Sequence, residues 1–298
     1  MAQPKPVTAM PTMPGRQIGR ALPRIEAREK VTGRAEYTHF MQLPGMLHAK
    51  IFRSTVAHGR IKSIDTRAAK KIAGVHRVVT CEDVRRVIPE PYYGPAFHDQ
   101  PILAIDKVHY VGEPVAVVLA ADPHIAEEAA ALIIADYEEL PAVLDELEAV
   151  ENKILVHEEL RPAGTFADLK HLKGRRDTNI ALDFKLRRGD VDQAFVHAAQ
   201  LFEETFRTQK VLHVALEPIA SIADWRESGV TIYTASQGPS FVRAEIARLL
   251  GLPENRVRIK VPYLGGGFGA KVYIKAEALA TALSMIVRRP AKVALTME

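Results

Sequence analysis

The chain has 298 residues, of which 47% are hydrophobic and 26% are charged. This composition is typical of a globular protein and excludes a mainly disordered or collagen-like chain, and the length favours two domains. No run approaches the roughly 18 apolar residues of a membrane span, so no membrane partner is expected. The single cysteine, Cys81, excludes an internal disulfide, an iron–sulfur cluster and a thiolate zinc site in this chain, and favours a reducing compartment.

The net charge of +4 is concentrated at the N-terminus. Residues 1–34 contain seven basic and two acidic side chains, so they carry +5 and the rest of the chain sums to −1. A surface that follows nucleic-acid phosphates carries its positive charge on the folded body. The distribution therefore predicts a basic arm and no nucleic-acid partner.

Residues 1–18 form the first predicted segment. Four prolines stand there among small and polar residues, a composition that cannot bury a core, and we predict a flexible tail. No apolar stretch follows a charged start, so the segment does not resemble a secretory signal. Together with the cysteine count, this predicts a cytoplasmic location.

Residues 19–145 are expected to form an α/β domain. Residues 47–52 alternate as a half-buried strand does, and residues 115–119 are a continuous apolar run typical of a buried strand. Asp122 and Pro123 then mark the start of a helix that continues to Leu132. Residues 133–137 are extended again. Residues 146–178 have little apolar character and are predicted to be an exposed connector.

A second unit is expected over residues 179–298. The pattern predicts strands at 230–233, 256–261 and 292–295, with helices at 240–250 and from Ile274 to about Val287. Few strands support this unit, which predicts a domain that is incomplete at its C-terminus.

A glycine-rich loop lies between the second and third of these strands, and it runs Gly265, Gly266, Gly267, Phe268, Gly269, Ala270, Lys271. Consecutive glycines are used where the backbone needs positive φ or approaches a ligand closely, and their N–H groups can bind anionic oxygen. Three interpretations are open. Gly265, Gly267 and Ala270 fit the dinucleotide fingerprint G-x-G-x-x-A, although no acidic residue follows at the required distance. The loop could also be a purely structural turn, or a cofactor loop of another kind.

Two further features precede this loop. Gln237 follows the strand at 230–233 and heads a helix, where its amide could donate to a bound oxygen. His213 and Glu217 are four residues apart and could share one helical face. This pair is too small for a metal site, so we favour a structural pair.

These features resemble the large catalytic subunit of the xanthine dehydrogenase and aldehyde oxidase family of molybdenum hydroxylases. The resemblance extends from about Ile18 to Glu298. Further motifs support it along the chain: Lys30–Tyr37, Pro44–Ala49, Gly74–Val75, Pro101–Ala104, Val111–Ala116, Asp136–Pro141 and Arg188–Asp192. The resemblance implies an α+β architecture, in which an α/β hammerhead domain (19–145) precedes the first part of a molybdopterin-binding domain (179–298).

The resemblance also implies a cofactor and its contacts. The cofactor is molybdenum on molybdopterin, which in bacteria is often extended to a cytosine dinucleotide. Gln237 would donate to the molybdenum oxo ligand, and the Gly265–Gly269 backbone, including Phe268, would contact that ligand or the pterin. No residue of the chain would bind the metal directly. Val272 stands where purine hydroxylases have a glutamate, which favours aldehydes or other N-heterocycles as substrates over purines.

The family's general-base glutamate lies in the C-terminal part of its large subunit, so no catalytic residue is expected in this chain. Glu217 and Glu277 are the carboxylates that could most easily be taken for a substitute general base, but no motif supports that role for either residue. The implied partners are a C-terminal molybdopterin-binding chain, an iron–sulfur subunit with 2Fe–2S clusters and an FAD subunit, which together oxidise a small-molecule substrate as a hetero-oligomer. Two alternatives stay open: a truncated, non-catalytic fragment, or a nucleotide-binding module that uses the glycine loop.

Overall fold

The computed structural model describes residues 21–164 and 167–297 and divides the chain into two units at residues 36 and 37. Within the first unit, helix α1 (Ala27–Val31) is accompanied by ion pairs from Glu26 to Arg24 and to Lys30. The predicted flexible tail, residues 1–18, lies outside the described residues. No described helix is long and apolar enough to cross a membrane.

The second unit is organised around a seven-stranded mixed sheet with the order β13-β12-β11-β14-β1-β7-β3. The first half of the chain contributes β1 (Leu47–Arg53), β3 (Val75–Val79) and β7 (Pro114–Ala120). The second half contributes β11 (Ala220–Arg226), β12 (Gly229–Thr234), β13 (Val257–Lys260) and β14 (Ala291–Ala294). The halves join where β1 pairs in parallel with β14, with Leu47 opposite Ala291. The two predicted domains therefore share one sheet.

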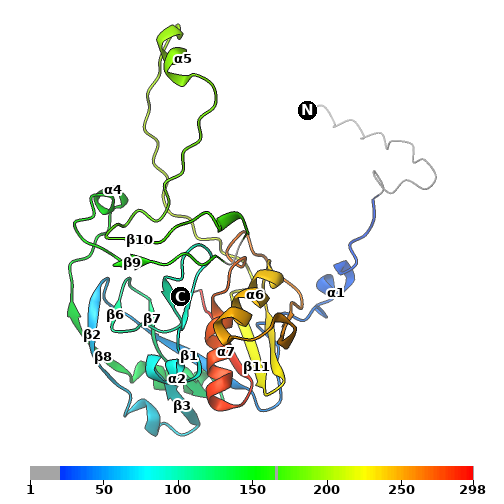
Figure 1. Cartoon of the computed structure of the whole chain (residues 1–298). Helices are drawn as coiled ribbons and strands as arrows, with labels where there is room; N and C mark the ends of the chain where they lie inside the picture. The colour runs from blue at the N-terminus through cyan, green and yellow to red at the C-terminus, as the bar shows by residue number, and fades with distance from the viewer. Residues whose placement is uncertain (1–20, 165–166, 298) are drawn as a thin grey trace, which may run out of the picture. The chain divides into compact units, whose positions relative to one another are not determined.

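Helices cover both faces of this sheet, and Figure 1 labels those that cover one of the two faces. Helix α7 (Ala276–Val287) packs on β11 and β14, α6 (Pro239–Leu250) packs beside β13, and α2 (Cys81–Val87) packs against α7. Helix α3 (Pro123–Ala131) covers β1 and β7 from the other side. Strand β7 serves both cores because its side chains alternate: Val117 and Leu119 face the α7 core, whereas Ala116 and Val118 face the α3 core.

The helix boundaries follow from local chemistry. The Asp122 side chain accepts a hydrogen bond of 2.8 Å from the His124 N–H, and Pro123 occupies the first helical position of α3. Helix α6 begins at Pro239 and ends at Gly251, whose φ of 61° closes the last turn. Pro290 follows the end of α7 and leads into β14, on which α7 packs.

Smaller sheets surround this body. Strands β6 (Lys107–Val108), β2 (Gly59–Asp65) and β8 (Ile134–Glu139) form one, and β4 (Tyr92–Tyr93) pairs with β5 (Gln100–Pro101). The predicted connector at 146–178 contains helix α4 (Glu146–Ala149) and a pair of strands, β9 (Glu159–Leu160) and β10 (Arg175–Arg176). It is therefore partly ordered, because its backbone pairs with itself. Single 3₁₀ turns occupy residues 69–71, 167–169 and 254–256.

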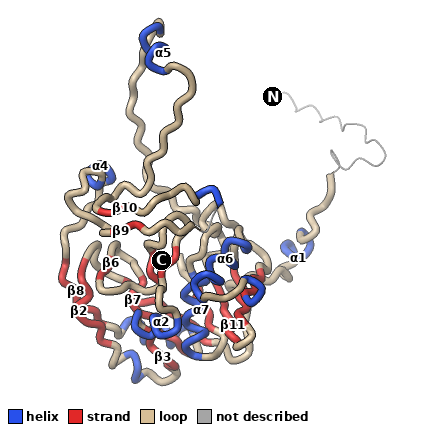
Figure 2. Tube along the Cα trace, in the orientation of Figure 1, coloured by secondary structure: helices blue, strands red, loops and turns tan. Residues whose placement is uncertain are grey.

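Residues 181–214 differ from the rest of the second unit, because every residue in this segment is exposed. Helix α5 (Val191–His197) is its only described regular element, and loop backbone flanks this helix on both sides (Figure 2). The segment leads directly into Ala215 and Glu217, which are buried.

Candidate functional site

The glycine-rich loop, Gly265–Lys271, connects β13 to the segment before α7. Gly266 and Gly269 have φ values of 98° and 92°, which only glycine adopts without strain. Phe268 has a φ of 52°, and its side chain is 71% exposed. A bulky residue in this conformation is uncommon and costs about 1–3 kcal/mol, so the surrounding contacts must hold it there.

The remaining two glycines are required by close packing. A Cβ on Gly265 would lie 2.4 Å from the Glu217 Cβ, and one on Gly267 would lie 2.3 Å from the Gln237 Cδ. Neither distance is tolerable for carbon atoms. The loop therefore needs glycine at these two positions because Glu217 and Gln237 press directly against its backbone.

Glu217 and Lys271 join the two ends of the loop. The Glu217 Oε2 accepts hydrogen bonds from the Gly265 N–H (2.8 Å) and from the Lys271 Nζ (3.3 Å). Lys271 also donates to the Glu217 carbonyl oxygen at 2.6 Å, and the Glu217 N–H donates to the Gly265 carbonyl at 3.1 Å. The side chains of the pair are only 5% and 2% exposed. This clamp holds the first and last residues of the loop on the segment that precedes β11.

Gln237 is attached to the same loop. Its backbone N–H donates to the Lys271 carbonyl at 2.8 Å, and its side-chain Oε1 accepts from the Gly269 N–H at 3.0 Å. Because a backbone N–H can bond only to the oxygen of the amide, this contact fixes the orientation of the side chain. The Nε2 group is left as a donor, and within the described ranges nothing accepts its hydrogen bonds.

The loop also presents backbone donors. Among residues 21–164 and 167–297, no acceptor is found for the N–H groups of Gly266, Gly267 and Phe268. Together with the Gln237 Nε2, these three N–H groups give the site a fixed side-chain amide donor and several backbone donors from one loop. Such a set suits an oxygen atom that carries negative charge. Val272 follows directly and is half-buried.

Several expectations need correction. No helix joins His213 to Glu217, so the helical spacing was misleading. Glu217 pairs with Lys271, whereas His213 is exposed and lies near Gly269. The dinucleotide interpretation also fails locally, because α7 starts at Ala276 rather than at the end of the glycine run. Sequence reasoning missed Lys271 as a partner of Glu217, although its position at the end of the glycine motif was a usable signal.

Glu277 has a structural role. It is buried at the start of α7, where it accepts hydrogen bonds from the Thr234 Oγ1 (2.6 Å) and the Lys275 N–H (2.8 Å). Burial raises the pKa of this carboxyl group, while these two hydrogen bonds act in the opposite direction. The side chain ties α7 to β12 and does not join the loop donors.

Adding one methyl group at Gly267 tests the close packing between the loop and Gln237. We expect Gly267→Ala to displace the Gln237 side chain, because the new Cβ would lie only 2.3 Å from its Cδ. Hydrogen exchange of the Gly269 amide should then accelerate at least tenfold, since its acceptor is lost. Gly174→Ala is the control, because its Cβ would meet only ordinary contacts at 3.6 Å or more. Equal exchange at Gly269 in wild type and Gly267→Ala would refute the packing.

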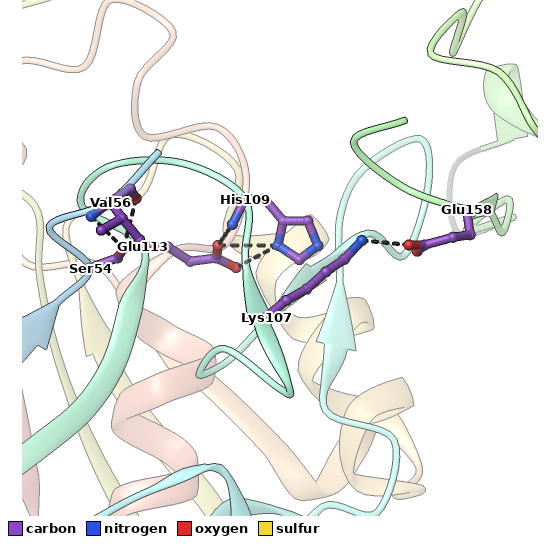
Figure 3. A network of polar contacts seen from close by, with 6 residues as sticks. All are labelled: Ser54, Val56, Lys107, His109, Glu113 and Glu158. Carbon is purple, nitrogen blue, oxygen red and sulfur yellow. Dashed lines mark hydrogen bonds and ion pairs between the residues drawn. The ribbon is translucent and has the colours of Figure 1, made fainter. Parts of the chain in front are cut away.

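A second polar cluster lies in the first half of the chain (Figure 3). The buried Glu113 accepts from the His109 N–H at 2.5 Å and contacts the His109 Nδ1 at 3.1 Å, while Lys107 is paired with Glu158 at 2.6 Å. The His109 ring stacks on His157 with a centroid separation of 4.6 Å. Burial lowers the pKa of His157, and the nearby His109 adds to this effect. The network attaches the connector to β6.

A cavity of about 530 Å³ adjoins this network and includes Tyr92, Asp99 and Arg161 in its wall. Burial raises the pKa of Asp99. None of the sequence-predicted site residues lines this cavity. Over the described part of the chain, no group of three or more histidine, cysteine, aspartate or glutamate side chains is arranged to hold a metal ion.

Two family models match successive parts of the chain. The model of the aldehyde oxidase and xanthine dehydrogenase a/b hammerhead domain matches residues 32–141, and that of the molybdopterin cofactor-binding domain matches residues 172–298. The nicotinate dehydrogenase large molybdopterin subunit of Eubacterium barkeri is 32% identical over 282 residues, which are 94% of this chain and 62% of that protein. Subunit gamma of the 6-hydroxypseudooxynicotine dehydrogenase complex of Paenarthrobacter nicotinovorans is 37% identical over 266 residues, covering 85% of this chain and 31% of the relative.

A solved structure agrees. Quinoline 2-oxidoreductase from Pseudomonas putida 86 matches 92% of this chain with a TM-score of 0.77 and 31% identity, over 34% of its own chain. The chain thus spans about a third of most of these relatives and 62% of the nicotinate dehydrogenase subunit. The hammerhead and molybdopterin-binding matches, in this order on one sheet, show that the chain belongs to the xanthine dehydrogenase and aldehyde oxidase family, as the N-terminal part of its large, molybdopterin-binding subunit.

Proposed function

We propose that this chain contributes the glycine-loop wall of a molybdenum–pterin centre in a molybdenum hydroxylase. The observation that carries the proposal is the fixed amide of Gln237, whose Oε1 is held by the Gly269 N–H while its Nε2 stays available to donate. An amide oriented in advance needs no reorganisation when an oxygen of the cofactor arrives.

The residues present fit such a group. The cofactor brings sulfur ligands of its own, so the protein must supply hydrogen-bond donors around its oxygen atoms rather than metal ligands. The Gln237 Nε2 and the N–H groups of Gly266, Gly267 and Phe268 are donors of this kind. When bound, the molybdenum centre would supply a two-electron oxidation that transfers oxygen derived from water to a carbon atom.

The residues of this chain would bind the cofactor and orient it. Gln237 would hold an oxygen ligand of the metal, and the loop backbone would contact the same ligand or the pterin. Gly265 serves this arrangement indirectly, because its N–H is bonded to Glu217 and holds the loop in place. Phe268 is exposed and would cover one side of the bound group.

The substrate is proposed to be an aldehyde or an N-heterocycle other than a purine. Val272 follows the loop and offers an apolar side chain where a purine would need a charged partner. The names of relatives support heterocyclic chemistry, since the similar proteins include a nicotinate dehydrogenase and a quinoline 2-oxidoreductase.

The proposed partners are a C-terminal molybdopterin-binding chain, which would supply the general base, and iron–sulfur (2Fe–2S) and FAD subunits, which would carry the electrons away. The names of several relatives state that they are large subunits or members of complexes. We propose the cytosine dinucleotide as the form of the pterin, and a cytoplasmic location stays a prediction from the sequence.

The test is native mass spectrometry of the protein isolated gently from its source, followed by pterin and molybdenum analysis. We expect a hetero-oligomer with one molybdopterin per glycine loop, and turnover of aldehydes or N-heterocycles. A bare chain without pterin would refute the proposal in favour of a non-catalytic fragment. Tight binding of a plain nucleotide without pterin would favour a nucleotide-binding module instead.

A further inference from the structure

The segment 181–214, here called the α5 arm, exposes a large amount of apolar surface. Phe184, Leu186, Phe202 and Phe206 are 75–88% exposed, although aromatic and aliphatic side chains of this size are normally buried. They lie on both sides of α5, so the exposed surface belongs to two flanks of the arm. So many exposed large apolar side chains on one segment are uncommon and indicate an interaction site.

Each flank has the residue pattern of a half-buried strand. In the first, Leu182, Phe184 and Leu186 alternate with Asp183, Lys185 and Arg187. In the second, Phe202, Phe206, Leu212 and Val214 share one parity with the polar residues Glu204, Thr208 and Lys210, whereas Leu201 and Val211 have the other parity. Because successive side chains of a strand point to opposite faces, the first flank would have one apolar and one polar face, and the second would have a mixed face that carries both of its phenylalanines.

The backbone of both flanks is unpaired. Within the described residues, no backbone hydrogen bond joins residues 181–188 or 199–214 to any other segment, and neither flank is assigned as a strand. Strand-like sequence with free N–H and C=O groups can accept a further strand along its edge. The flanks thus have the composition of strands and lack the sheet to which they would belong.

We infer that the α5 arm is the docking surface for the C-terminal molybdopterin-binding part of the large subunit, which adds β-structure to its two flanks and buries their apolar faces. This inference rests on the proposed function, because it names where that partner binds. The occupant is a polypeptide that presents strand edges and an apolar sheet face. In the first flank, the charged residues between the apolar ones stay in solvent on the opposite face.

Three observations favour this occupant. The arm lies inside residues 172–298, which match the molybdopterin cofactor-binding domain, so its missing neighbours belong to the same kind of subunit. Alignments of similar length, 282 and 266 residues, cover 62% of one relative and 31% of another. The molybdopterin subunits of the family therefore differ about twofold in length, which is consistent with a subunit divided between two polypeptides. The arm also continues into Ala215, whose Cβ is 3.3 Å from a Cβ placed on Gly266, and so ends at the loop.

The experiment places a photo-crosslinking amino acid at Phe206 in the protein expressed in its source organism. Irradiation of the isolated native protein should link residue 206 to sequence from the C-terminal molybdopterin-binding part of a large subunit, identified by peptide mass spectrometry. The same amino acid at Arg207 is the matched control. It lies on the opposite face, so its yield of this product should be at least tenfold lower.

A second measurement uses substitutions. Phe202→Asp with Phe206→Asp should reduce the amount of this polypeptide that co-purifies by at least tenfold, because the carboxylates would be buried without partners. Thr205→Asp with Arg207→Asp is the matched control and should retain it. Crosslinks only to another copy of this chain, to an iron–sulfur or FAD subunit, or to nothing would overturn the inference, as would full co-purification of the Phe202→Asp, Phe206→Asp variant.

Molybdenum analysis of the same sample separates this inference from the proposed function. A crosslinked complex that contains no molybdopterin would support the docking surface and refute the function. A molybdopterin-loaded complex whose crosslinks avoid the arm would support the function and overturn the docking surface.

Discussion

Replacing Gln237 with glutamate should lower turnover of the assembled enzyme by about 100–1,000-fold, the usual effect of losing one preorganised donor to a charged oxygen. The substitution is informative because a carboxylate can still accept from the Gly269 N–H, while the Nε2 donor is removed. The loop should therefore keep its shape. The measurement is steady-state turnover per bound molybdenum atom, with molybdopterin content determined on the same sample.

Two further variants sharpen this result. Gln237→Ala should lose as much activity, and native mass spectrometry should show a complex of unchanged composition. Gln42→Glu makes the same chemical change at an exposed glutamine remote in sequence from the loop, and should leave turnover within twofold of wild type. Full activity of Gln237→Glu in a complex that contains molybdopterin would show that the Gln237 amide does not donate to the cofactor.

The largest effect on stability is expected at the Glu217–Lys271 clamp. In Lys271→Met, the Glu217 carboxylate stays buried and loses its cation, a change that typically costs about 3–5 kcal/mol of the free energy of unfolding. That is a large fraction of the roughly 5–15 kcal/mol that stabilises a typical domain. Urea denaturation measures the loss, and hydrogen exchange of Gly265 should accelerate with it.

The paired variant Glu217→Gln, Lys271→Met provides the internal check. With the charge gone on both sides, most of the lost stability should return, because no uncompensated buried charge is left. Lys62→Met breaks the exposed ion pair with Glu138, whose side chains are 56% and 48% exposed, and should cost no more than about 1 kcal/mol. If Lys271→Met were as mild as Lys62→Met, the clamp would not hold the loop.

Local signals predicted the regular elements well. Alternation and apolar runs located β1 and β7, and the Asp122-Pro123 signal located the start of α3. Helices α6 and α7 lie where their apolar faces indicated, within two residues at each end. These features depend on residues close together in the chain, so the order of residues is sufficient to find them.

Local sequence patterns did not predict the contacts between residues that are far apart in the chain. The His213–Glu217 spacing pointed to a helix that does not form, because Glu217 is instead bonded to Gly265 and Lys271, about fifty residues away. Residues 181–187 alternate apolar and charged side chains but do not form a strand, because a strand needs a paired edge and none of the described residues supplies one. In the first case the deciding partners lie far away in sequence, and in the second none is found among the described residues.

The glycine-rich loop shows most clearly which features the sequence determines and which require the tertiary structure. Its composition alone identified an unusual backbone, and its motif together with Gln237 pointed to the family that the comparisons then showed. Only the folded chain distinguishes the glycines needed for positive φ, Gly266 and Gly269, from Gly267, which must admit the Gln237 side chain. Only the fold orients the Gln237 amide, because a hydrogen bond between residues 32 positions apart decides which of its atoms is free to donate.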